Sequence, residues 1–139
     1  MNAYPRIKRQ TLICALGGAA IDAVSSAKRW PGVDIWNGRS QVPPVPSGAL
    51  VVAVLQEDVS LEPLRILYVH CFGRGLLVMA VAMAERSTGL HGEWMNCVRA
   101  WCDMLVVTAD PDYPMEVVEA LQLSGANLVS AQQWPSSTH

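Results

Sequence analysis

Charged side chains are scarce in this chain of 139 residues: 16% of the residues are charged, whereas 51% are hydrophobic. So few charges among so many apolar residues exclude an intrinsically disordered chain. The formal net charge of -2 also excludes a nucleic-acid-binding protein that depends on overall positive charge. We therefore expect a folded globular protein and do not favour nucleic acid as its partner.

The chain also lacks the motifs that mark most metal, cofactor and catalytic sites. Its four cysteines form no C-x-x-C pair and lie in apolar surroundings, which is typical of buried free thiols rather than of a disulfide framework or a zinc site. No nucleotide-binding loop with a GK[ST] ending and no EF-hand loop is present. We assign no catalytic residue, metal ligand or cofactor, and we favour a protein that is not an enzyme.

Long hydrophobic runs are absent as well. No apolar stretch reaches the roughly 18 uncharged residues of a membrane-spanning helix, and the run GLLVMAVAMA at 75–84 predicts a core helix instead. Basic residues at 6–9 precede the uncharged run TLICALGGAAI, which is the pattern of a secretion signal, although glycines interrupt it. We expect a cytoplasmic protein with no membrane partner, and a secretion signal is the alternative.

The length of the chain predicts a single globular domain over residues 1–139. One segment rich in proline and glycine, at about 31–48, interrupts the regular patterns and holds four of the nine prolines. Proline fixes φ and removes a backbone donor, so this segment is expected to be a surface loop.

Apolar side chains recur at steps of three and four residues in two long segments. The first set is Ile13, Leu16, Ala20, Val24 and Ala27, and the second is Trp94, Val98, Trp101, Leu105 and Thr108. This spacing predicts helices within 7–29 and at about 93–107. A further helix is expected at 114–123, between a proline at its start and a glycine past its end.

Together these patterns predict a mainly α fold, a single compact helical domain with minor β content. The alternative is a small α/β or α+β layer fold in which the apolar runs TLICAL, ALVVAVL, LRILYV and MLVVTA are strands. Periodicity does not separate a short buried strand from a buried helix. The choice between helix and strand therefore stays open for residues 11–16, 49–55, 64–72 and 104–109.

Tryptophan is over-represented among the aromatic residues, with five tryptophans against one phenylalanine. Trp30, Trp36 and Trp134 lie in or beside segments rich in proline or glycine or close to the chain end, and Arg39 follows Trp36 closely. Tryptophan with nearby arginine in a loop is the composition of protein interface hot spots. We therefore predict an interface at Trp30, Trp36, Arg39 and Trp134.

A second candidate site comprises His70, Gly73, Arg74 and Gly75. If the Gly-Arg-Gly triplet opens the apolar helix expected after it, the free N–H groups of that helix and the Arg74 guanidinium would bind an anion. Asp110 to Asp112 would supply carboxylates to the same pocket.

Two functions follow from these features. The first is a non-enzymatic protein–protein interaction module, such as an adaptor, an inhibitor or an immunity-type binder, whose partner is another protein or, as a homodimer, a second copy. The alternative is a small enzyme or an anion- or ligand-binding domain with a pocket near His70, Arg74 and Asp110–Asp112.

Overall fold

The core of the protein is a sheet of five parallel strands in the order β2-β1-β3-β4-β5. A computed structural model describes residues 10–84 and 92–123. The strands are β1 Thr11–Leu16, β2 Val33–Trp36, β3 Leu50–Gln56, β4 Val78–Met83 and β5 Met104–Thr108. The helices are α1 Gly18–Ala23, α2 Glu62–Phe72, α3 Gly92–Ala100 and α4 Tyr113–Leu123, with a 3₁₀ turn at Ser25–Arg29.

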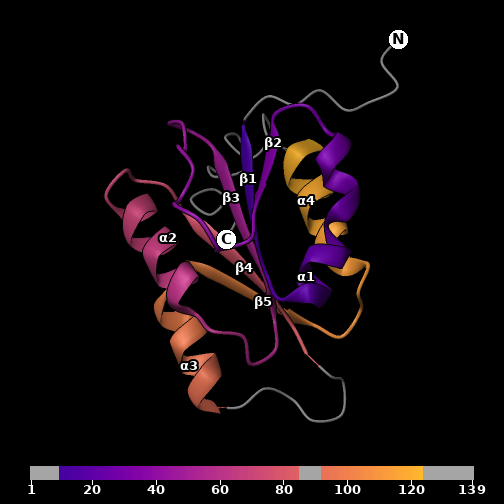
Figure 1. The fold of residues 1–139 in the computed structure, drawn as a ribbon, viewed down its shortest axis with the longest axis vertical. Coiled ribbons are helices and arrows are strands. Elements are labelled where there is room, and N and C mark those ends of the chain that lie inside the picture. Colours follow the sequence, from indigo (N-terminus) through magenta and orange to yellow (C-terminus); the bar gives the residue numbers. More distant parts are fainter. Residues whose placement is uncertain (1–9, 85–91, 124–139) are drawn as a thin grey trace, which may run out of the picture.

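Helices cover both faces of the sheet (Figure 1). α2 and α3 pack on one face through Leu64, Leu67 and Val98, whereas α1 and α4 pack on the other through Ala20 and Val118. This is a doubly wound α/β arrangement, because the connection after β1 crosses one face and the connection after β3 crosses the other. The chain therefore changes direction between the neighbouring strands β1 and β3.

The all-parallel sheet shows that the prediction of a mainly α domain was wrong and that the α/β alternative was right. The physical reason is that strands covered on both faces carry continuous apolar runs, which have no period of two. β1 is buried at every position, and β3 at five consecutive positions. Propensity for helix in such runs is overridden by the packing of helices on both sides.

The structure assigns each apolar run of the sequence to a strand or to a helix. The runs at 11–16, 50–55 and 104–108 are strands, as the α/β alternative expected, and the first of these turns into α1 at the glycines. LRILYV is not a strand but lies in α2, and VMAVAM is not a core helix but β4. The helix expected over 93–107 ends at Ala100, because its second half is the edge strand β5.

The proline-rich segment replaces a helix on one face of the sheet. β2 occupies 33–36, inside the loop predicted at about 31–48, and residues 37–49 then connect β2 to β3 without a helix or strand. Val45 is fully buried within the core on the α2 side, together with Trp36. This segment therefore covers the sheet where a crossover helix would otherwise pack. The single domain expected over 1–139 stays a prediction for the chain as a whole.

Membrane insertion through a helix finds no support in the structure. Within residues 10–84 and 92–123, no helix combines the length and the apolar character that crossing a bilayer requires.

Candidate functional site

The carboxyl edge of a doubly wound sheet is where ligands usually bind, at the point where the chain changes direction. In this protein that point lies between the ends of β1 and β3, and Gln56 fills it. The Gln56 Oε1 atom accepts a hydrogen bond of 2.8 Å from the Ala19 backbone N–H at the start of α1. A Cβ atom on Gly17 would lie 2.5 Å from the Gln56 Cβ atom. The side chain of Gln56 thus closes this crevice.

Two shallow cavities flank this closed point. The larger, of about 730 Å³, lies between α1 and α4, and the smaller, of about 430 Å³, lies over the ends of β3, β4 and β5. Ala19, Met83 and Pro111 line both cavities, so the two are continuous. Carboxylates line this joined surface, and we call it the acidic groove. They belong to Asp22, Glu57, Asp58, Asp112, Glu116 and Glu119.

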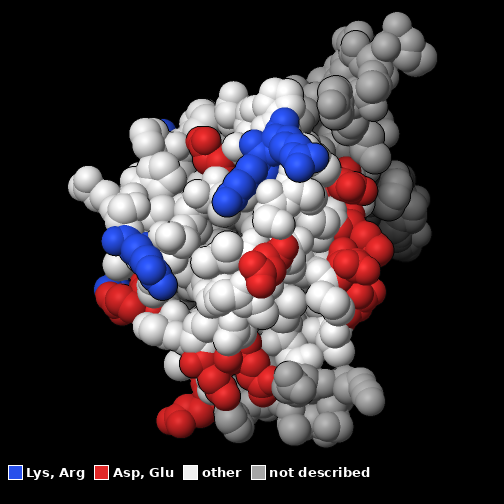
Figure 2. Space-filling view, turned by 45° about the vertical axis from the view of Figure 1, so that its right-hand side comes forward, with Lys and Arg blue, Asp and Glu red and all other residues white. Residues whose placement is uncertain are grey.

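Among the residues that the structure describes, no lysine or arginine lines the acidic groove. In the view of Figure 2 acidic side chains gather along the right-hand side and at the lower end of the molecule, while the basic ones lie at the top and at the left. Among the described residues, no three His, Cys, Asp or Glu side chains come together closely enough to hold a metal ion. The chemistry available here is electrostatic attraction of a cationic group, with methionine side chains for apolar contact.

On the opposite side of the sheet, α2 carries exposed apolar side chains. In α2, Leu64, Leu67 and Cys71 face the sheet and are fully buried. On the outward side, Ile66, Val69 and Phe72 are 42%, 55% and 71% exposed, and we call these three residues the α2 outer face. They are spaced by three residues each, which places them along one side of the helix. α2 is therefore apolar both toward the core and toward the solvent.

Aromatic packing fixes the position of the α2 outer face. The Tyr68 ring lies between α2 and α3, with its centroid 6.0 Å from the Phe72 ring and 6.0 Å from the Trp101 ring, which it meets edge-on. At the other end of α3, the Trp94 indole donates a hydrogen bond of 2.9 Å to the Val59 carbonyl. These contacts tie α2 and the segment before it to α3 and the residue after it.

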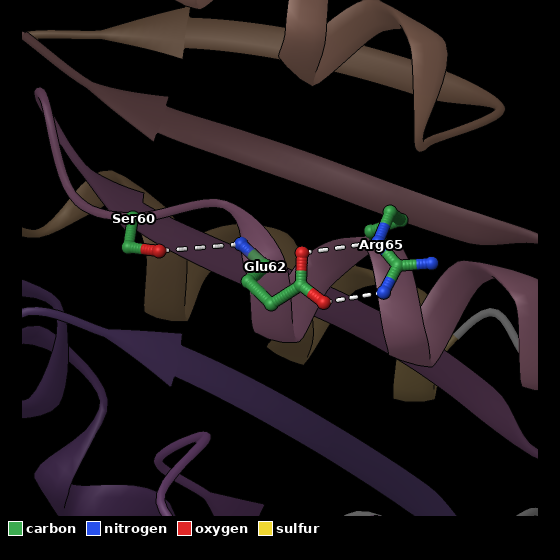
Figure 3. Close-up of polar contacts among 3 residues, drawn as sticks. All are labelled: Ser60, Glu62 and Arg65. Atoms are coloured by element: carbon green, nitrogen blue, oxygen red, sulfur yellow. Dashed lines mark hydrogen bonds and ion pairs between the residues drawn. The ribbon is translucent and has the colours of Figure 1, made fainter.

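Charges occur at the start of α2 (Figure 3). The Arg65 guanidinium donates to both carboxylate oxygens of Glu62, and the Nε bond is 3.0 Å long. This contact holds the pKa of the Glu62 carboxyl below its ordinary value and raises that of Arg65. The Ser60 hydroxyl accepts a hydrogen bond of 3.4 Å from the Glu62 backbone N–H at the start of α2.

The predicted tryptophan interface is not assembled as one exposed surface. Trp36 is only 5% exposed, and its indole N–H donates to the Ser40 carbonyl at 3.2 Å. Trp30 is half-buried and packs against the core on the α1 side. Arg39 is exposed, and its backbone N–H donates a hydrogen bond to the Asn37 side chain in a local turn. Trp134 lies outside the described residues.

The residues of the predicted anion site lie at the C-terminal end of a helix, which does not favour anions. Gly73, Arg74 and Gly75 follow the last residue of α2, so they lie beside its carbonyl groups rather than the N–H groups that bind anions. The segment after them begins β4, not a helix. His70 and Arg74 precede β4, whereas Asp110 and Asp112 follow β5. Because the strands are parallel, the first pair lies toward the amino ends of the strands and the second pair toward their carboxyl ends.

The turn at 110–112 is held by its own hydrogen bonds. The Asp110 carboxylate accepts a bond of 2.9 Å from the Asp112 N–H, and the Thr108 hydroxyl accepts one of 3.0 Å from the Asp110 N–H. Such bonds are typical of aspartate and threonine in turns. Of this pair, Asp112 lines the acidic groove.

The thiols give no sign of a nucleophile. All four cysteines are free, and burial raises the pKa of Cys14 to about 12 and that of Cys71 to about 11. Burial and the charge of Asp103 also raise the pKa of Cys102. A thiol with a raised pKa is poorly reactive at neutral pH. Cys97 is exposed and lines a cavity of about 280 Å³ between α2 and α3.

The sequence analysis missed both surfaces described above. The signal for the α2 outer face was present, because the run LEPLRILYVHCF has apolar side chains on more than one side of a helix. The acidic groove had no local signal, since its carboxylates come from loops and helices far apart in the chain. The chain matches no model of a protein family, no curated protein and no solved structure.

Proposed function

We propose that this chain is a non-enzymatic protein–protein interaction domain that binds its partner through the α2 outer face. The observation that carries the proposal is the two-sided apolar character of α2. A surface helix ordinarily has one apolar and one polar side, and a helix that is apolar all round is normally buried. A partner that covers Ile66, Val69 and Phe72 would restore this condition.

The neighbouring residues support this proposal. Aromatic and arginine side chains beside an apolar centre are typical of interfaces, and Tyr68, Trp101 and Arg65 surround the α2 outer face. The Glu62–Arg65 ion pair lies at its edge, where an interface has its polar rim.

The proposal is tested by affinity capture from host lysate with the tagged chain and with the variant Val69→Glu. The matched control is Met104→Glu, because Met104 is a similarly exposed apolar residue on β5, away from α2. We expect one protein, another chain or an untagged copy, to be captured by the parent and by Met104→Glu and lost with Val69→Glu. Equal capture by all three would contradict the proposal.

A second candidate function rests on the acidic groove. Its position at the carboxyl edge of the sheet, its volume and the carboxylates among its described lining residues favour a ligand that carries several positive charges, such as a polyamine. Thermal shift with spermidine tests this function, with ATP as the anionic comparison. Stabilisation by spermidine that disappears in Glu116→Gln would support it, and no shift at millimolar spermidine would remove it.

A further inference from the structure

We draw no further inference here: the strongest candidate, the cavity of about 280 Å³ between α2 and α3 that the exposed Cys97 thiol lines, carries no proposal because the Arg65 guanidinium on its wall is already paired with Glu62 and nothing in the described part of the structure shows what the cavity would bind.

Discussion

At the scale of single residues, Gly17 sets how closely the end of β1 approaches the end of β3. Its φ of 100° is unfavourable for a residue with a side chain, and Gln56 and Val59 occupy the space where a Cβ atom would lie. The same contact lets Gln56 bind the start of α1 and close the crevice at the point where the chain changes direction.

We expect Gly17→Ala to lower the free energy of unfolding by more than about 2 kcal/mol, because the conformation alone costs roughly 1–2 kcal/mol and the overlap with Gln56 adds to it. Gly48→Ala is the control, since its φ is 80° but no atom lies within 4 Å of the added Cβ. It should cost only the conformational part. Urea unfolding measures both, and equal losses would contradict the close packing at Gly17.

Trp36 is also a residue whose environment differs from what its type suggested. A tryptophan beside proline and glycine indicated an interface, but this one is inside the core, and only the three-dimensional path of residues 37–49 places it there. We expect Trp36→Ala to lower the free energy of unfolding by about 3–5 kcal/mol. A chemical denaturation curve within 1 kcal/mol of the parent would show that Trp36 is not a core residue.

The buried thiols make stability depend on alkaline pH. The pKa of Cys14 is raised to about 12 in the folded state from its ordinary value of 9.0, because burial disfavours the thiolate. Above pH 9 the unfolded chain releases this proton while the folded chain keeps it, so stability is full below pH 9 and falls as the pH rises toward 12.

For Cys14 alone the slope should approach about 1.4 kcal/mol per pH unit. Urea midpoints measured at pH 8 and pH 10.5 should therefore differ less in Cys14→Ala than in the parent. An identical pH dependence in both proteins would show that the Cys14 thiol is not protected by burial.

At the scale of the element, α2 has two different apolar sides. Leu67 contributes to the core against the sheet, whereas Val69 faces outward in the isolated chain. We expect Leu67→Ala to cost about 2–5 kcal/mol, and Val69→Ala to stay within about 0.5 kcal/mol at low protein concentration. If Val69→Ala is as costly as Leu67→Ala in the dilute chain, the outer side of α2 is already covered within the monomer.

The elements also show what local sequence determines. α4 begins at Tyr113, next to the predicted start at 114, because the proline there is favoured in the first turn of a helix. β3 and β4 had no such marks: both are short apolar runs, and only the neighbouring strands and the helices on both faces make them strands. The local sequence pattern therefore predicts an element better where a residue such as proline marks its limit than where the element is a short buried apolar run.

At the scale of the whole molecule, the two faces of the sheet support different surfaces. α1 and α4 form the acidic groove on one side, and α2 presents its apolar outer face on the other. The groove joins Asp22 to Asp112 and Glu116, which lie far from it in the chain, so it depends on the sheet order. The α2 outer face depends on one helix, and its residues were therefore readable once that run was known to be helical.

The central claim is that a protein partner covers the α2 outer face. The most direct test replaces Phe72 with a photoreactive phenylalanine analogue in the native host, with the analogue at Met104 as the matched control. We predict one crosslinked product of defined mass from position 72 that is absent from position 104, at twice the mass of the chain if the partner is a second copy. No product from position 72, or the same products from both positions, would contradict the account.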